Sequence, residues 1–479
     1  MNNKLTKNYF YNLIYQVVMI IGPVITVPFL ARSLGASGVG EYSYCYSLTG
    51  YFVLAATLGC DVYGRREISY VKEDILERSK RFWSIQIIKI VSTIFVFFVY
   101  LLFSFNSKNS TMLLILGIHL LNVPLNIGWF FQGTEQFKMI TRRGLFLKII
   151  ELIFVLLFIH KPGDLLLYTL GSSLIAFITF FVLWIDLKKY LTKVEIRDLN
   201  IKNDLKNCFV FFLPSIATSI YTMLDKTMLG IMTESFIENG YYEQSLKINI
   251  IFLRVVLSLG TVLMPAIAYA FKQGNMEVVF KNIKKSIKYV YFIALPIAFG
   301  LCAISDIFVP WFFGAGFGEV SVLLKISGFI LIFQGISDVL GVQYLVTTGK
   351  QNLYIISLFI GAFFNFACNL YLIPRFQSIG AIVASLLSES IIAGIQMYFV
   401  RNEFKFVKLL KLSKNYLIAS VIMFIMINYF IKFLNASIID NILVAGVGGA
   451  IYIIILLILK DSFAISIINP VKKKLLNRR

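Results

Sequence analysis

Ionisable side chains inside long apolar runs are the first residues of this sequence that could do chemistry. Asp225 and Lys226 stand side by side within the apolar run 208–232. A charge in hydrocarbon costs roughly 2.5–3.5 kcal/mol on insertion scales, so such residues usually face a bundle interior or a wet cavity. Lys247 and Arg254, in the next apolar run, project from nearly the same helix face, two turns apart. Cations on one stripe could hold a pyrophosphate through charge-assisted hydrogen bonds.

Other polar residues occupy comparable positions. Lys89 and Lys325 lie near the ends of apolar runs, where a long side chain can reach the membrane interface. Asn365 and Asn369 are four residues apart and share a helix face. Two interpretations stay open for all these groups. They are static ion pairs and interhelical hydrogen bonds that hold helices together, or they form a basic cavity for an anionic head group with an ion site beside it.

The composition indicates which solvent these residues meet. The chain is 58% hydrophobic and 15% charged, with a mean hydropathy of +0.80, and a soluble protein of this length would need far more charge. The sequence therefore predicts a polytopic membrane protein. The net charge is +20, and the basic residues that produce it lie between the apolar runs, where they set the orientation of the protein in the membrane. We therefore expect no nucleic-acid partner. The five cysteines and two histidines lack disulfide or zinc spacing.

Apolar runs of about 18–25 residues recur along the chain, which is the length of a membrane-spanning helix. They predict an all-α fold of about fourteen transmembrane helices. We read the first as a retained span instead of a removed signal peptide, because no small-residue cleavage site follows it. The predicted spans are 9–30, 40–62, 84–104, 111–132, 145–160, 165–187, 208–232, 245–270, 288–305, 320–346, 353–373, 379–400, 415–434 and 441–459.

The number of lysines and arginines alternates between low and high in successive connections between the predicted spans. One set of connections is poor in them, whereas the other set and both termini are rich, so both termini are predicted to be cytoplasmic. This orientation requires an even number of helices, in agreement with the count above. The basic residues of the two richest loops are Arg65, Arg66, Lys72, Arg78, Lys80 and Arg81, and Lys188, Lys189, Lys193, Arg197, Lys202 and Lys206.

An internal repeat divides the chain. The string 29–35 followed by Gly40-Glu-Tyr42 has a counterpart about 200 residues later in 227–230 followed by Gly240-Tyr-Tyr242. Because the copies start from the same side of the membrane, they predict two pseudo-symmetric six-helix lobes related by an axis along the membrane normal. The expected parts are an N-terminal lobe at 1–190, a C-terminal lobe at 207–400, two accessory helices at 414–460 and a basic cytoplasmic tail at 461–479.

These motifs, with Ile373-Pro-Arg-Phe376 and Ile379-Gly-Ala-Ile382, resemble the multidrug/oligosaccharidyl-lipid/polysaccharide exporter superfamily, and more narrowly its Wzx-type flippases. The resemblance covers the whole chain. It implies a flippase without a resident cofactor that carries an undecaprenyl-pyrophosphate-linked oligosaccharide across the bacterial cytoplasmic membrane by alternating access, for O-antigen or capsule synthesis. It also implies contact with membrane lipids and with the polysaccharide polymerase machinery.

The lipid II flippase branch of this superfamily has a sodium site formed by three helices. At similar spacing this sequence has Asp225, Asn365, Asn369, Ala381 and Ser385, so the resemblance implies a coupling-cation site there. Asn369 stands where that branch has a carboxylate. A single formal negative charge remains, which leaves both Na⁺ and H⁺ open as the coupling ion.

Lys247 resembles the cationic cavity position of that branch, and the predicted pyrophosphate cavity comprises Lys247, Arg254, Lys89 and Lys325. Two other functions are alternatives. A multidrug/cation antiporter of the same superfamily usually has twelve helices and a cavity suited to cationic drugs. A membrane polysaccharide polymerase needs acids or bases on a long extracytoplasmic loop, and the predicted loops are short. We therefore expect a transporter and not an enzyme.

Overall fold

The structure is a computed structural model that describes residues 3–233, 235–434 and 437–466, without the side chains of 3–21, 214, 217–222 and 406–407. The secondary structure of the described residues is helical, with no strand among them, which confirms the predicted all-α fold. The chain divides into two compact units, Met1–Gly240 and Tyr241–Arg479.

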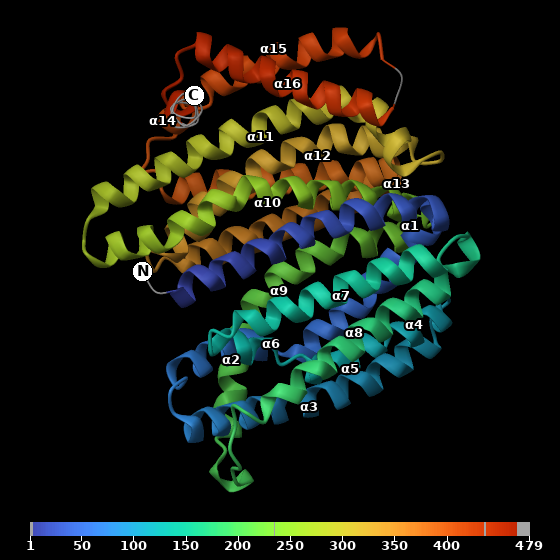
Figure 1. Cartoon of the computed structure of the whole chain (residues 1–479), viewed down its shortest axis with the longest axis vertical. Coiled ribbons are helices and arrows are strands. Elements are labelled where there is room, and N and C mark those ends of the chain that lie inside the picture. The colour runs from blue at the N-terminus through green and yellow to red at the C-terminus, as the bar shows by residue number, and fades with distance from the viewer. Residues whose placement is uncertain (1–2, 234, 435–436, 467–479) are drawn as a thin grey trace. The chain divides into compact units, whose positions relative to one another are not determined.

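The first unit begins with α1 and ends after α9 (Figure 1). Its helices begin where the chain offers a cap. The carboxylate of Asp74, for example, accepts hydrogen bonds from the N–H groups of Leu76 and Glu77 and so starts α3. The elements are α1 (Asn3–Thr57), α2 (Cys60–Tyr70), α3 (Ile75–Phe105), α4 (Ser110–Leu116), α5 (Ile118–Leu125), α6 (Gly128–Gly133), α7 (Phe137–Phe158), η1 (Pro162–Asp164), α8 (Leu165–Leu187), η2 (Ile196–Asp198) and α9 (Ile201–Met232).

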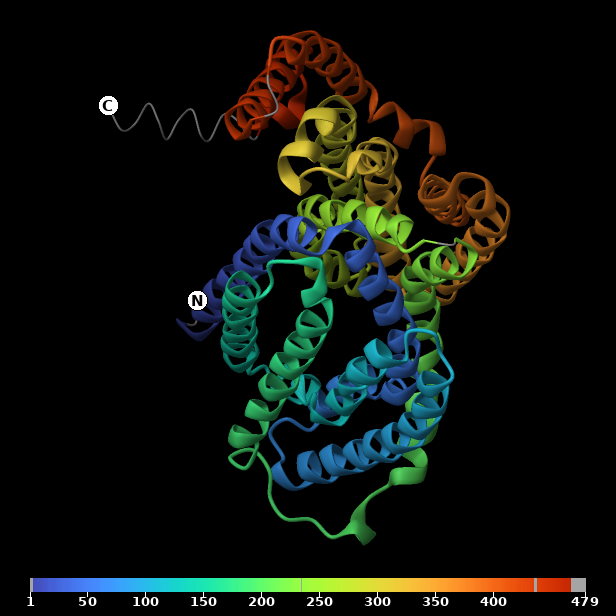
Figure 2. The same cartoon turned by 90° about the vertical axis from the view of Figure 1, so that its right-hand side faces the viewer.

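The second unit takes most of α10 and everything after it. Ser437 and Asp440 form a capping box that starts α16, and α15 and α16 pack against α11 (Figures 1 and 2). The elements are α10 (Ile237–Lys272), α11 (Met276–Phe313), α12 (Gly318–Ser337), the π-helix η3 (Asp338–Val346), α13 (Gln351–Phe399), α14 (Phe406–Lys411), α15 (Lys414–Ile431) and α16 (Ile438–Ile458).

Ten helical segments of the described chain are long and apolar enough to cross a membrane. Two of them are 49 residues long, and each contains a helix that bends at a residue with non-helical dihedral angles: Gly35 at φ 69° in α1 and Gln377 at φ 50° in α13. Gly35 adopts this left-handed conformation without a steric penalty. Counting the halves separately, together with α7 and α9, reproduces the predicted set of about fourteen membrane helices. The loops expected near 31–39 and 374–378 are therefore sharp kinks.

The glycines of the predicted repeat meet one another in the first unit. A Cβ atom on Gly40 would lie 1.7 Å from the carbonyl oxygen of Phe236, and one on Gly240 would lie 2.0 Å from that of Ala36. Both distances are far inside van der Waals contact with backbone atoms, which cannot rotate away. The segments 36–40 and 236–240 therefore touch backbone to backbone, and only glycine fits at either position.

A buried carboxylate ties three helices of the first unit together. Asp204, on α9, is fully buried. It accepts hydrogen bonds from the Tyr63 hydroxyl at 2.7 Å, the Arg81 guanidinium at 2.8 Å and the Ser84 hydroxyl at 2.5 Å. A buried carboxylate is tolerated only when it is paired and hydrogen-bonded, and here the donors come from α2 and α3. These contacts hold α2, α3 and α9 in a fixed arrangement.

The predicted boundaries of the lobes stay a prediction. The compact units separate after Gly240. The expected division into 1–190, 207–400 and 414–460 is based on the internal repeat, which is a different criterion from compactness. Of the predicted basic tail at 461–479, the part beyond residue 466 lies outside the described residues.

Candidate functional site

Two adjoining cavities lie within the first unit, with volumes of about 490 and 340 Å³. Asp61, Asn126 and Phe180 line both of them, so we treat the two together as the polar chamber. The walls come from α1, α2 and the α5–α9 segments. Volumes of this size are typical of ligand-binding pockets.

Asp61 sits where the two cavities join, and Lys89 neutralises it from behind. The Lys89 ammonium donates to the Asp61 carboxylate at 2.6 Å and to the carbonyl oxygen of Asn126 at 2.9 Å. The Lys89 side chain is 0% exposed, whereas the Asp61 side chain is 35% exposed. The carboxylate therefore faces the chamber, and the predicted cavity cation Lys89 is buried behind it as a counter-charge.

The smaller cavity carries the positive charge of the chamber. Arg65, on α2, donates to the side-chain oxygen of Gln132 at 3.1 Å. Arg143, on α7, lies over the ring of Phe180 at 4.2 Å. A guanidinium offers five donors in a planar fork that matches phosphate oxygens. Because Lys89 already offsets Asp61, these two arginines give this end of the chamber its net positive charge.

The larger cavity carries hydrogen-bonding groups without net charge. His119 contacts the Ser173 hydroxyl at 3.2 Å, and the ring of Tyr46 meets it edge-on at 5.4 Å. Asn122 also lines this cavity and is 4% exposed, and neither its amide nitrogen nor its amide oxygen has a hydrogen-bond partner among the described residues. A buried amide without partners is destabilising, which makes Asn122 the most unusual residue of the chamber wall.

The remaining predicted cavity cations lie in the second unit. Lys247 and Arg254 are both on α10, which is helical throughout between them. The Lys247 ammonium lies 3.6 Å from the Glu243 carboxylate, one turn earlier on the same helix, and Arg254 is exposed. Lys325, on α12, forms a 2.7 Å ion pair with Asp306 on α11. The structure thus pairs both lysines with carboxylates of their own unit.

Four of the five residues predicted for the coupling cation come together in the second unit. The two halves of α13 fold against each other at Gln377: the Ser388 hydroxyl donates to the carbonyl oxygen of Gly361, and a Cβ on Gly380 would touch the Leu372 backbone. Asn365, Asn369, Ala381 and Ser385 lie between these two contacts and are all buried.

Within this group the amide nitrogen of Asn369 donates to the side-chain oxygen of Asn365 at 3.1 Å, and the Ser385 hydroxyl lies 3.1 Å from the hydroxyl of Tyr242. Asp225 belongs to the first unit, on α9, and is 4% exposed. Two residues after it, Thr227 contacts the hydroxyls of Ser47 and Tyr51 on α1. The coupling role of all five residues stays a prediction.

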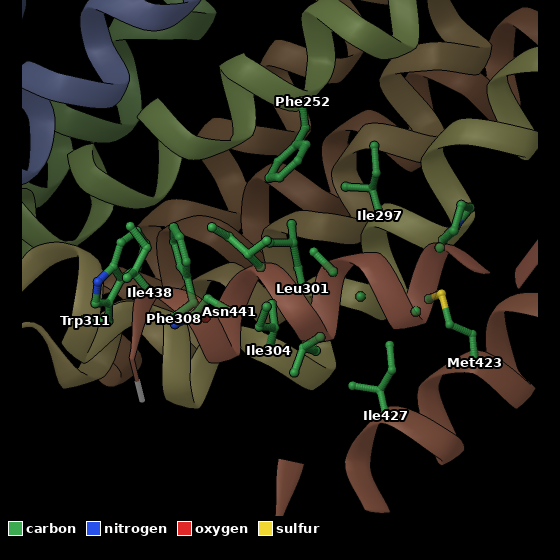
Figure 3. Close-up of a pocket in the computed structure, with 17 residues that line it drawn as sticks. Phe252, Ile297, Leu301, Ile304, Phe308, Trp311, Met423, Ile427, Ile438 and Asn441 are labelled. Carbon is green, nitrogen blue, oxygen red and sulfur yellow. The ribbon is translucent and has the colours of Figure 1, made fainter. Parts of the chain in front are cut away.

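An apolar groove of about 480 Å³ runs along one side of the second unit (Figure 3). Its side chains converge from four helices: Phe252 from α10, Leu301 and Phe308 from α11, Met423 from α15 and Ile438 from α16. Asn441 is a polar member of an otherwise apolar lining. The groove can take a hydrocarbon chain but offers no charge to a head group.

Comparison with known proteins identifies the family. Residues 5–271 match the model of the family described as polysaccharide biosynthesis protein. The chain belongs to this family. An Escherichia coli (strain K12) protein that carries the provisional name O-antigen transporter is 21% identical over 84% of this chain and 98% of its own length. The capsular polysaccharide biosynthesis protein CapF of Staphylococcus aureus is 23% identical over 84% of this chain and all of its own.

The fold of this polysaccharide biosynthesis protein is also found in a solved structure. The lipid II flippase MurJ, in its inward closed conformation, superposes with a TM-score of 0.76 at 16% identity, covering 94% of this chain and 99% of MurJ. The predicted resemblance to the polysaccharide branch of the exporter superfamily is confirmed by the family match and by this shared fold. The chain is a multi-pass membrane protein, and the named relatives are transporters, flippases and biosynthesis proteins.

Nothing in the sequence marks Arg65, Arg143 and Asn122 as residues of a site. Both arginines lie close to the ends of apolar runs, where they are indistinguishable from the lysines and arginines that set membrane orientation. Asn122 is one amide in an apolar run, and its lack of partners is visible only in three dimensions. The available signal was the pair Asp61 and Lys89, which place opposite charges at the edges of two neighbouring apolar runs.

Proposed function

We propose that this protein is a flippase that carries an undecaprenyl-pyrophosphate-linked oligosaccharide from the inner to the outer leaflet of the bacterial cytoplasmic membrane. The observation that carries the proposal is the polar chamber of the first unit. Membrane-spanning helices there enclose two arginines and a set of uncharged hydrogen-bonding groups. Anionic phosphate and polar sugar are the two parts of such a substrate that cannot cross hydrocarbon unaided.

Two further features support the proposal. The family is one of polysaccharide biosynthesis, and relatives are named for O-antigen transport and capsular polysaccharide biosynthesis. The apolar groove of the second unit suits the hydrocarbon chain of a polyprenyl carrier, because its lining is almost wholly apolar. The proposal places both termini on the cytoplasmic side, as the distribution of lysine and arginine predicts.

The chamber also argues against a multidrug antiporter. A cationic drug would meet Arg65 and Arg143, and like charges in a partly desolvated cavity repel one another strongly. An anionic pyrophosphate would instead accept hydrogen bonds from both guanidinium groups. The chamber therefore favours an anionic cargo.

The test uses a strain that lacks the chromosomal gene and therefore lacks surface polysaccharide. The wild-type gene is expected to restore the polysaccharide, and the double variant Arg65→Gln, Arg143→Gln is expected to restore less than about a tenth of it. Arg66→Gln is the matched control, because Arg66 lies beside Arg65 on α2 but stacks on Phe211 outside the chamber lining. Full restoration by the double variant, or drug resistance without polysaccharide on expression of the wild type, would refute the proposal.

We also propose that transport is coupled to a cation bound at Asp225. An acid in this position can exchange H⁺ or Na⁺ as the protein alternates between its two faces. Asp225→Asn is expected to lower transport while the protein still inserts into the membrane at the wild-type amount. Transport into vesicles under imposed Na⁺ or pH gradients identifies the ion, and normal surface polysaccharide in cells with only this variant would contradict the coupling role.

A further inference from the structure

Asn122 is buried in the wall of the polar chamber with both polar atoms of its amide unsatisfied. It is 4% exposed, lines the larger cavity, and has no hydrogen-bond partner among the described residues. Native proteins retain few such groups, and each one points to strain, to a bound molecule or to a functional role. An apolar residue of similar volume would be more stable here if packing were the only demand.

The neighbours of Asn122 indicate which kind of molecule would fit beside it. His119, on the same helix one turn earlier, is held by Ser173 and packs edge-on against Tyr46. These groups donate and accept hydrogen bonds without net charge, as the hydroxyl and amide groups of a sugar do. The larger cavity shares Asp61 with the smaller cavity, where Arg65 and Arg143 suit a pyrophosphate. The chamber therefore has an anionic-ligand end and a neutral hydrogen-bonding end next to each other.

We infer that Asn122 binds the first sugar of the lipid-linked oligosaccharide, the one joined directly to the pyrophosphate, and so helps to select which repeat unit is carried. This inference rests on the proposed function. With the pyrophosphate at the arginines, the adjoining sugar occupies the larger cavity, and its hydroxyl or acetamido group completes the hydrogen bonds of the Asn122 amide. A site built to hydrogen-bond a substrate group rejects an analogue that lacks the group.

The experiment compares two carriers on the purified full-length protein in detergent. One probe is undecaprenyl pyrophosphate, and the other is the same carrier bearing a single N-acetylhexosamine. The wild type is expected to bind the sugar-bearing carrier about three- to tenfold more tightly, which is the effect of one net hydrogen bond. Asn122→Ala and Asn122→Leu are expected to abolish this preference and to leave the affinity for undecaprenyl pyrophosphate unchanged.

A thermal unfolding measurement separates this role from a structural one. Because the amide is unpaired within the protein, its removal is expected to leave the melting temperature unchanged or to raise it. Asn106→Ala is the matched control, since Asn106 is an exposed residue at the end of α3, outside the chamber, and this variant should keep the preference.

The possible results point in different directions. A preference retained in both Asn122 variants, or a melting temperature that falls in both, would overturn the inference. Equal binding of the two carriers by the wild type would also overturn it, while the proposed function would stand. Binding of neither carrier by the wild type would refute the proposed function, and the inference with it.

Discussion

The ion pair of Asp61 and Lys89 makes an asymmetric prediction about stability. The Lys89 side chain is 0% exposed and the Asp61 side chain is 35% exposed, with 2.6 Å between the charged atoms. Asp61→Asn keeps an acceptor oxygen but removes the negative charge, so the buried Lys89 ammonium is left with neutral partners such as the carbonyl oxygen of Asn126. Stranding a buried charge in this way costs about 3–5 kcal/mol. Lys89→Met leaves a carboxylate that water in the chamber can reach, at a cost of about 1–3 kcal/mol.

The double variant Asp61→Asn, Lys89→Met tests the same reasoning from the other side. It removes both charges, so no buried charge is left without a partner. We therefore expect the double variant to be more stable than Asp61→Asn alone. The assay is the fraction of monodisperse protein that survives heating in detergent, measured by size-exclusion chromatography. The expected order of melting temperatures is wild type, then Lys89→Met, then Asp61→Asn, with the double variant above the last. Equal losses in the two single variants would refute the assignment of Lys89 as the buried partner.

Two other contacts of the first unit give sharp predictions. Gly40→Ala is expected to lower the yield and the melting temperature markedly, because the added Cβ would lie 1.7 Å from the carbonyl oxygen of Phe236. Gly446→Ala is the control and should change neither, because a Cβ at Gly446 would have nothing within 4 Å. An unaffected Gly40→Ala protein would show that 36–40 and 236–240 do not touch. Asp204→Leu removes the buried charge but leaves three donors from α2 and α3 without their acceptor, at a cost of about 2–4 kcal/mol. Arg81→Met leaves the buried Asp204 carboxylate without its cation, at a cost of about 3–5 kcal/mol, so the melting temperature of Arg81→Met is expected to fall at least as far as that of Asp204→Leu.

The fold class was predictable because the membrane imposes it. Backbone groups in hydrocarbon must be satisfied within the segment, so a run of about twenty apolar residues becomes a helix whatever its neighbours are. Helix ends were less predictable. The expected breaks near 31–39 and 374–378 are single kinked residues, Gly35 and Gln377. Gly35 is a glycine in the left-handed region, but no local pattern distinguishes Gln377 from the glutamines that continue a helix.

The candidate site was less predictable, because the sequence shows charges but not their partners. Lys89 was expected to be a cavity cation, and its partner Asp61 lies 28 residues earlier, on another helix. The kink at Gln377 folds α13 on itself and brings Asn365 and Asn369 alongside Ser385, and the coupling role of these residues stays a prediction. The spacing along the sequence therefore pointed to residues that one helical hairpin brings together, whereas the pairing of Lys89 with Asp61 depends on packing between helices, which the sequence does not show.

The charge of the chamber follows from this pairing and can be changed without changing the arginines. In the wild type Lys89 offsets Asp61, which leaves Arg65 and Arg143 to attract an anion. Lys89→Met exposes an uncompensated carboxylate to the bound phosphate, so we expect undecaprenyl pyrophosphate to bind at least about tenfold more weakly. Adding Asp61→Asn removes that charge and should restore the affinity. Stability alone cannot produce this pattern, because the double variant is expected to regain binding even where it does not regain the wild-type melting temperature. If binding instead followed melting temperature across the three variants, the chamber would not be the place where the anion binds.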